Sequence, residues 1–308
     1  MGYQFKDALT GSTIECDFPM LDTRIMKGER ERCTSLFFPG CSFINYALPL
    51  VSAVYETLRS QNLADGISFL CCGKILSYEP EGETRRAAFE VEFVERLLET
   101  DIERIICACP NCVKALRDAF EKDERMAGRS VELVALPQIL AQVGYKIDPG
   151  VAAQLIKGSA DEPVKLCTHD SCPDRDYGEF ADGLRGLLPD GLWVDPEHSR
   201  NRSLCCGSLP RAAGKYEAAD KLAHRNGQEA VDAGADALVT ACLSCAFQLT
   251  YCQPYVQVVN YLELLYSWRI DWSLTGGLMK LRFLFDENLG AEEVEPSGRS
   301  FVSLEPAE

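Results

Sequence analysis

Long apolar runs are scarce in this sequence of 308 residues. The longest apolar stretches, such as residues 47–54, fall far short of the roughly 20 residues that a helix needs to cross a bilayer. The first ten residues also lack the basic region and apolar segment of a signal peptide. We therefore expect a cytoplasmic protein that reaches a membrane only through a partner.

Positive charge is also scarce, and the common cofactor motifs are missing. The 31 Lys and Arg residues oppose 47 Asp and Glu residues, which gives a formal net charge of -16. This charge would repel a phosphate backbone, so we expect no nucleic-acid binding. No Gly-x-Gly-x-x-Gly motif opens a helix after a strand, so no flavin or nicotinamide site is expected in this chain. The four-cysteine run of ordinary ferredoxins is absent as well.

Cysteine, in contrast, is abundant, and its motifs occur twice. The chain has 15 cysteines, and a reducing compartment favours their use in metal binding or catalysis over disulfides. A Cys-Cys-Gly motif at residues 71–73 recurs at 205–207. A Cys-x-x-Cys motif at 109–112 recurs at 242–245, at almost the same offset. Two matches in register indicate a tandem duplication.

Short apolar runs alternate with longer amphipathic ones around both copies, which predicts parallel α/β units. The predicted strands are 34–38, 67–70, 104–106 and 131–135, and then 164–168, 202–204, 237–240 and 256–259. The predicted helices are 83–99, 137–143, 211–232 and 261–268. The fold class is therefore α/β, with two duplicated domains related by pseudo-twofold symmetry, each a small, mainly parallel sheet flanked by helices. The cysteines follow strands, so they should meet at the carboxyl edge of each sheet.

The predicted organisation has five segments. They are an N-terminal arm (1–31), a first domain (32–145), a linker (146–163), a second domain (164–270) and a C-terminal extension (271–308). Proline and glycine mark the linker, where residues 151–157 are expected to form a short helix. In the extension we expect a covering helix at 278–285 and an acidic tail from residue 292.

Each copy offers five cysteines as candidate ligands. The alignment of the two copies adds one cysteine that closes the turn after the first strand of each. The two sets are Cys41, Cys71, Cys72, Cys109 and Cys112, and Cys172, Cys205, Cys206, Cys242 and Cys245. Cys33 and Cys167 lie near the same two strands and are the alternatives to Cys41 and Cys172. We assign no role to Cys16, Cys107 and Cys252, because free cysteine is commonly a small buried hydrophobe.

Iron–sulfur chemistry explains these sets better than the alternatives. Five thiolates exceed the four ligands of a structural zinc site. Adjacent cysteines point in divergent directions, which suits several irons better than one ion. A redox-active Cys-x-x-Cys pair would leave the adjacent pair unexplained, and a disulfide between adjacent cysteines would be strained. Zinc in at least one copy remains the main alternative, ahead of inert buried cysteine.

The paired pattern resembles the cysteine-rich CCG domain, whose mark is Cys, then Cys-Cys-Gly, then Cys-x-x-Cys. The tandem arrangement over residues 32–270 resembles the cysteine-rich, tandem-CCG component of heterodisulfide reductase and its bacterial relatives. The resemblance implies a non-cubane 4Fe–4S cluster in each domain, held by the five cysteines of its set. It also implies that a disulfide substrate is cleaved between the two clusters. We expect an oxygen-sensitive, anaerobic system, since exposed clusters and thiolates oxidise readily.

Two functions follow from this resemblance. The first is the iron–sulfur subunit of a disulfide-reducing complex, supplied with electrons by a ferredoxin-like iron–sulfur subunit or a flavoprotein. The second is a non-catalytic electron-transfer subunit of a lactate, glycolate, glycerol-3-phosphate or succinate dehydrogenase-type complex. A zinc-stabilised interaction module is a third, weaker hypothesis. We favour the first because both five-cysteine sets are complete.

A few other residues near the motifs could contribute. His169 lies three residues before Cys172 and could donate a proton to a product thiolate, or be a structural histidine hydrogen-bonded in the turn. Lys74 and Arg211 follow the two Cys-Cys-Gly motifs and could attract an anionic substrate, or be solvated side chains. His198 and His224 are expected to be ordinary surface residues.

Overall fold

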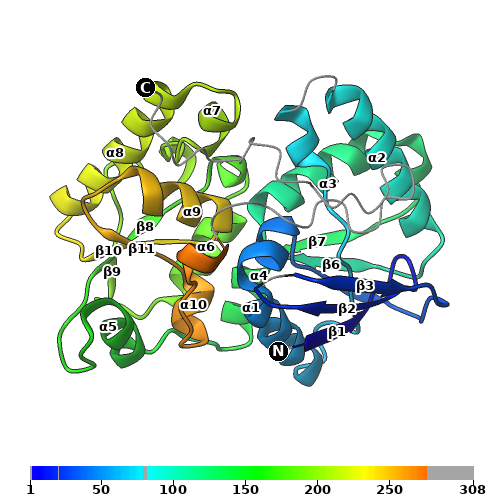
Figure 1. The fold of residues 1–308 in the computed structure, drawn as a ribbon, viewed down its shortest axis with the longest axis horizontal. Helices are drawn as coiled ribbons and strands as arrows, with labels where there is room; N and C mark the ends of the chain where they lie inside the picture. The colour runs from blue at the N-terminus through cyan, green and yellow to red at the C-terminus, as the bar shows by residue number, and fades with distance from the viewer. Residues whose placement is uncertain (1, 20, 79–81, 276–308) are drawn as a thin grey trace. The chain divides into compact units, whose positions relative to one another are not determined.

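A computed structural model describes residues 2–19, 21–78 and 82–275 (Figure 1). These residues group into two compact units, of which the first ends at Val134 and the second begins at Ala135. The pseudo-twofold relation between the two domains stays a prediction.

The first unit is built on a four-stranded sheet in the order β5-β4-β6-β7. Its strands are β4 (Ser35–Phe38), β5 (Gly66–Ile67), β6 (Arg104–Cys107) and β7 (Glu132–Ala135). β4 pairs in parallel with both β5 and β6. Leu36, Phe37 and Phe38 are all buried, as expected for a parallel strand covered on both faces.

Three helices accompany this sheet, and two of them begin at or next to a predicted ligand, at Cys41 and after Cys109. The helices are α1 (Cys41–Ser60), α2 (Gly82–Leu98) and α3 (Pro110–Lys122), with 3₁₀ turns η1 (Lys74–Tyr78) and η2 (Glu124–Met126). α1 is kinked at Ala47, whose backbone is non-helical, two residues before Pro49. Proline accounts for the kink because it lacks the N–H that would continue the helical hydrogen bonds.

The second unit repeats the strand order of the first, as β11-β10-β8-β9. Its strands are β8 (Leu166–His169), β9 (Trp193–Val194), β10 (Ala237–Thr240) and β11 (Gln257–Asn260). β8 pairs in parallel with β9 and β10, and β10 pairs in parallel with β11. The duplicated α/β fold predicted from the sequence is confirmed.

The helices of the second unit include one that follows the last strand of the first sheet. They are α4 (Leu136–Gln142), α5 (Pro149–Lys157), α6 (Glu179–Leu187), α7 (Ser208–Ala212), α8 (Tyr216–Asp232), α9 (Leu243–Cys252), α10 (Tyr261–Leu265) and α11 (Trp272–Thr275), with η3 (Cys172–Asp174) and η4 (Arg200–Arg202). α4 packs so closely on α6 that a Cβ on Gly183 would lie 2.4 Å from the backbone nitrogen of Gln138. The sequence assigned α4 to the first domain, whereas its packing groups it with the second unit. The other predicted boundaries stay predictions.

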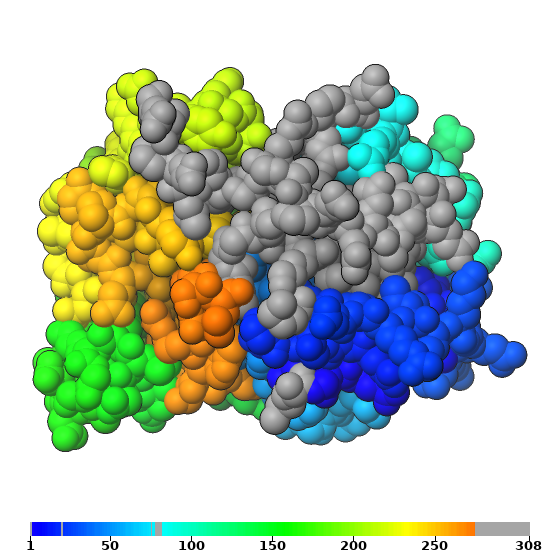
Figure 2. Space-filling view, in the orientation of Figure 1, coloured from blue at the N-terminus to red at the C-terminus, as the bar shows by residue number. Residues whose placement is uncertain are grey.

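The N-terminal segment, predicted only as an arm, contains a three-stranded antiparallel sheet. Its strands are β1 (Gly2–Lys6), β2 (Thr13–Asp17) and β3 (Thr23–Met26), in sequential order. Figure 2 shows this segment, in dark blue, at the surface of the first unit. Between β1 and β2 the chain runs along the edge of the parallel sheet, where the backbone N–H of Ala8 donates to the carbonyl of Ile67 at 2.9 Å.

A buried carboxylate fixes the N-terminal sheet to the parallel sheet. Asp7 is fully buried, and one of its carboxylate oxygens accepts hydrogen bonds from the backbone of Leu9 and from the backbone and hydroxyl of Thr10. The other oxygen accepts from the Ser68 hydroxyl at 2.9 Å and the Phe69 N–H at 2.7 Å. This carboxylate therefore holds the segment that leads directly into the first Cys-Cys-Gly motif.

Three predicted elements differ from the structure. The strand at 67–70 is reduced to β5 because the Phe69 amide turns to Asp7 rather than to a strand. The strand at 202–204 is wrong: the edge strand is β9, and the chain instead forms η4, where the Arg200 N–H bonds to Asp170 at 2.7 Å. The helix at 211–232 divides into α7 and α8 because Gly214 has a φ of 75°, outside the helical region.

The predicted covering helix at 278–285 and the acidic tail from residue 292 lie outside the described residues. Within the described ranges, every helix is too short or too polar to cross a membrane.

We predict that Asp7→Ala lowers the free energy of unfolding by about 3 kcal/mol, because several buried donors lose their acceptor and each costs about 1–3 kcal/mol. Urea denaturation measures this change. Asp22→Ala, at an exposed position just before β3 of the N-terminal sheet, is the matched control and should change stability by less than about 0.5 kcal/mol. Equal effects of the two variants would contradict the anchoring role of Asp7.

Candidate metal centres

The cysteines of the first set lie on three segments that follow neighbouring strands. Cys41 opens α1 after β4, Cys71 and Cys72 follow β5, and the last two flank the start of α3 after β6. Because these strands are parallel, their carboxyl ends meet at one edge of the sheet. The fold therefore brings together cysteines that are far apart in the sequence.

The five sulfur atoms of the first set form a continuous chain of contacts. The Cys71 thiol contacts those of Cys41 and Cys72, Cys72 contacts Cys112, and Cys112 contacts Cys109. Four of the five side chains are buried, and Cys41 is half-buried. All of them are free thiols.

The second set repeats this chain of contacts in the same order. Cys205 contacts Cys172 and Cys206, Cys206 contacts Cys245, and Cys245 contacts Cys242. Each residue thus occupies the position of its partner in the sequence repeat. The structure brings together all ten cysteines that the sequence selected, in two separate groups of five.

The third residue of each Cys-Cys-Gly motif has to be glycine, because its φ is positive and neighbouring atoms leave no room for a side chain. Gly73 and Gly207 have φ values of 70° and 97°, which side chains disfavour. A Cβ on Gly207 would lie 2.4 Å from the carbonyl oxygen of Ala219, and one on Gly73 would lie 2.7 Å from the ring of Phe89. The motif therefore combines two sulfur donors with a turn that packs closely against a long helix later in the same unit, α2 in the first and α8 in the second.

The thiols of the first set have pKa values that are shifted in opposite directions. Donation from Cys112 and then from Cys71 holds the pKa of Cys72 well below its ordinary value. The contact with Cys41, the contact with Cys72 and burial raise the pKa of Cys71 well above it. The contact with Cys109, the contact with Cys72 and burial do the same for the pKa of Cys112.

The pKa values of the second set are also shifted in opposite directions. The lowered pKa belongs to Cys205, the first cysteine of its Cys-Cys-Gly motif, whereas in the first set it belongs to Cys72, the second cysteine. Donation from Cys172 and Cys206 lowers the pKa of Cys205 to about 2. The pKa values of Cys172 and Cys206 are raised, in each case first by the contact with Cys205. The pKa of Cys245 is raised first by its contact with Cys206. One thiolate is thus stabilised because its neighbours stay protonated.

This donor chemistry fits an iron–sulfur group in each unit. Five neighbouring thiols, most of them buried, cannot all ionise beside one another unless positive charge is brought among them, as metal ions do. Five sulfur donors exceed the requirement of a single tetrahedral zinc ion. The residues that would hold the group are the five cysteines of each set.

Comparison with known families agrees with this geometry. The family model of CCG, described as a cysteine-rich domain, matches residues 35–117 and 167–250, which together make up more than half of the chain.

The chain belongs to the CCG family, with two cysteine-rich domains in tandem.

Each matched region contains the five cysteines of one set, so the family assignment and the two groups of sulfur atoms coincide. CCG domains are cysteine-rich, and their presence here fits iron–sulfur binding and electron transfer.

Other comparisons add little to the CCG assignment. A search of curated proteins found no match. Among solved structures, the chain is 14% identical to a glutamate racemase from Bacillus anthracis, covering 77% of this chain and 79% of that one, with a TM-score of 0.32. An aspartate racemase from Picrophilus torridus is 12% identical over 79% of this chain and 98% of that one, with a TM-score of 0.33. Likeness at this level carries no argument about activity.

The alternative ligands occupy other environments. The Cys33 thiol donates to the Asp65 carboxylate at 3.2 Å, and burial and that contact raise its pKa. The Cys167 thiol faces the carbonyl oxygen of Thr168 at 3.9 Å, and burial raises its pKa to about 12. The sulfur contacts therefore favour Cys41 and Cys172 as the fifth members of the two sets.

The basic residues after the motifs differ from each other. Burial, and then the nearby Arg86, lower the pKa of Lys74, whereas the charge of Cys72 opposes this shift, so Lys74 lies within electrostatic range of the first set. Arg211 is buried, pairs with Asp220 and lies over the ring of Tyr216 at 5.5 Å. Arg211 therefore makes structural contacts, and we do not expect it to bind a substrate.

A buried ion pair that the sequence analysis missed supports the second set. Arg185 donates to both carboxylate oxygens of Asp170 at 2.8 Å, and also to Asp195. Burial opposes the ionisation of Asp170, but these bonds lower its pKa below the ordinary value. Asp170 also accepts the Arg200 N–H, so it connects the segment before Cys172 to the segment that leads to the second Cys-Cys-Gly motif. Its position between His169 and Ser171, close to a ligand cysteine, was the only signal in the sequence.

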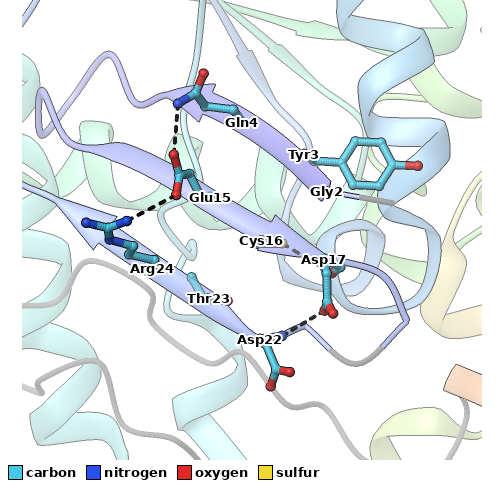
Figure 3. Close-up of a pocket in the computed structure, with 9 residues that line it drawn as sticks. All are labelled: Gly2, Tyr3, Gln4, Glu15, Cys16, Asp17, Asp22, Thr23 and Arg24. Atoms are coloured by element: carbon cyan, nitrogen blue, oxygen red, sulfur yellow. Dashed lines mark hydrogen bonds and ion pairs between the residues drawn. The ribbon is translucent and has the colours of Figure 1, made fainter.

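A hollow on the N-terminal sheet is unrelated to these centres. It is lined by residues of β1, β2 and β3, among which Gln4, Glu15 and Arg24 pair across the strands (Figure 3). Its one cysteine is Cys16, and burial raises the pKa of that thiol to about 11. The lining contains none of the ten predicted ligands, and we interpret it as a solvated sheet face.

We predict that Gly40→Ala removes the metal of the first centre and leaves that of the second. Gly40 has a φ of 81°, and a Cβ there would lie 2.9 Å from the sulfur of Cys112. The matched control is Gly144→Ala, where φ is 90° and nothing lies within 4 Å of the added Cβ. Gly40 has a ψ of 156°, in a region that essentially only glycine adopts, so Gly40→Ala should lose about 1–3 kcal/mol of stability. Gly144→Ala should lose about 1–2 kcal/mol because its φ is positive. Iron analysis after anaerobic reconstitution should show about half the metal only in Gly40→Ala. Full metal content in that variant would contradict the close packing inferred for the first set.

Proposed function

We propose that this protein is the iron–sulfur subunit of a heterodisulfide reductase-like complex and reduces a disulfide substrate. The observation that carries the proposal is the completeness of the two groups: ten free thiols, five in each unit, arranged in the same order of contacts. The proposal includes one non-cubane 4Fe–4S cluster per domain.

The overall reaction takes a disulfide, two electrons and two protons to two thiols. A bound cluster would supply one-electron redox chemistry and a metal site for sulfur. The chain's own residues would hold each cluster at the carboxyl edge of a sheet, in buried surroundings that limit access of water. Asp7 in the first unit and Asp170 in the second would keep the cysteine segments in place.

Electrons are proposed to come from a partner, because the sequence lacks a dinucleotide-binding motif of its own. A ferredoxin-like iron–sulfur subunit or a flavoprotein subunit would fill this role. The alternative function is a non-catalytic electron-transfer subunit of a lactate, glycolate, glycerol-3-phosphate or succinate dehydrogenase-type complex. It would use the same centres without binding a substrate at them.

Serine substitutions separate these functions. We predict that Cys72→Ser and Cys206→Ser each lose one centre, and that either change reduces disulfide cleavage to the background rate. The reason is that each substitution removes a central member of one chain of sulfur contacts. The assay follows oxidation of reduced viologen by a small organic disulfide under anaerobic conditions, with iron measured on the same samples.

Cys16→Ser and Cys252→Ser are the controls, since both cysteines lie outside the two sets. They should keep the iron content and the activity of the parent chain. Near-normal turnover in one of the two centre variants, despite loss of iron, would contradict a mechanism that needs both centres. If the parent chain holds both centres but catalyses viologen oxidation by none of the disulfides tested, the result would support the electron-transfer alternative.

A further inference from the structure

His169, at the carboxyl end of β8, has one ring nitrogen in a hydrogen bond and the other without a partner. Its Nδ1 lies 2.8 Å from the side-chain oxygen of Asn226. Its Nε2 is buried and has no hydrogen-bond partner in the described part of the chain. A buried polar atom without a partner costs free energy, so we expect this nitrogen to bind a ligand.

The surroundings of Asn226 determine which nitrogen of His169 carries the proton. The Asn226 amide group donates to the carbonyl oxygens of Cys205 at 3.0 Å and Leu222 at 2.8 Å. Its NH₂ group therefore points away from the imidazole, and its oxygen must accept a hydrogen bond from Nδ1. Nδ1 is then the protonated nitrogen of the neutral ring, and Nε2 carries the free lone pair. This arrangement does not suit the proton-donor role considered for His169.

The free lone pair lies among the sulfur atoms of the second set. A ring nitrogen of His169 and the sulfur atoms of Cys206 and Cys245 all lie within 4.8 Å of one another, and all three side chains are buried. Because Nδ1 is bonded to Asn226, Nε2 is the nitrogen available to a metal there. A metal bonded to nitrogen at about 2.0 Å and to sulfur at about 2.3 Å keeps those two atoms within about 4.3 Å of each other. A hydrogen bond from the other ring nitrogen to a fixed acceptor is also the usual companion of a metal-bound histidine.

The first unit has no such nitrogen at the equivalent position. Phe38 ends β4 opposite Cys107, as His169 ends β8 opposite Thr240. Phe38 packs edge-on against Phe93, with ring centroids 5.8 Å apart. An aromatic pair in the first unit thus replaces the His169–Asn226 pair of the second.

We propose that His169 Nε2 is a metal ligand of the second centre, in addition to the five cysteines of that set. The inference rests on the second set holding a metal, as in the proposed function, but not on disulfide reduction. The two centres would then differ in donor set, with sulfur alone in the first and sulfur plus one imidazole in the second. Imidazole is a neutral donor, and replacing thiolate by histidine in other iron–sulfur centres raises the reduction potential. We expect the second centre to have the higher potential.

The experiment is pulsed EPR of the full chain with ¹⁵N-histidine, after iron analysis and poising of the centres in a paramagnetic state. The chain has only three histidines, so few nitrogen atoms carry the label. We expect a strongly coupled nitrogen whose signal changes from ¹⁴N to ¹⁵N on labelling. His169→Phe, which introduces the residue found at the equivalent position of the first unit, should abolish this coupling and lower the potential of one centre.

The matched control is the double variant His198→Gln, His224→Gln, which should keep the coupling because it changes the other two histidines. If both the unlabelled and the labelled parent chain contain iron but neither shows a histidine nitrogen coupling, the ligand inference is overturned. The proposed function would still stand. Absence of iron from the second set would overturn both. The parent-chain measurement decides the question even where His169→Phe fails to fold.

Discussion

Mutual crowding of five thiols at the edge of each sheet is the constraint on which the rest of this structure depends. The sulfur atoms touch in an unbroken order, and burial removes the water that would otherwise stabilise their charge. In each group, hydrogen bonds from neighbouring thiols are the largest cause that stabilises a thiolate, at Cys72 in the first and at Cys205 in the second. Bringing all five to the ionised state that metals bind requires compensating positive charge, and this couples cluster binding to release of protons.

Short connecting segments and buried hydrogen-bonded carboxylates hold the cysteines of each group close together. Parallel strands deliver the cysteines to one edge, and glycines such as Gly40 and Gly73 allow the backbone to approach sulfur and side chains closely. The two units use different anchors for the same purpose. Asp7 from the N-terminal sheet holds the first Cys-Cys-Gly segment, while the Asp170–Arg185 pair holds the second.

Much of this arrangement could be predicted from the sequence, because the repeat indicated both the duplicated α/β units and the choice of cysteines. The predicted strands at β4, β6, β8 and β10 are confirmed, and so is the duplicated fold. Edge strands were predicted poorly because β5 and β9 are two residues long, too short for a periodic pattern. Asp7 and Asn226 could not be found at all, since their roles depend on contacts with residues distant in sequence.

Duplication has therefore preserved the sulfur geometry more closely than its surroundings. A phenylalanine pair stands beside the first group where a histidine and an asparagine stand beside the second. Such a difference would allow two otherwise equivalent centres to have different redox properties.

The most direct test of the account is the iron, acid-labile sulfide and zinc content of the anaerobically purified chain, with an EPR spectrum of the same sample. The account predicts about eight irons per chain with matching sulfide, as two four-iron clusters require. Zinc without sulfide, after attempted reconstitution, would contradict it and would make the ten cysteines structural ligands.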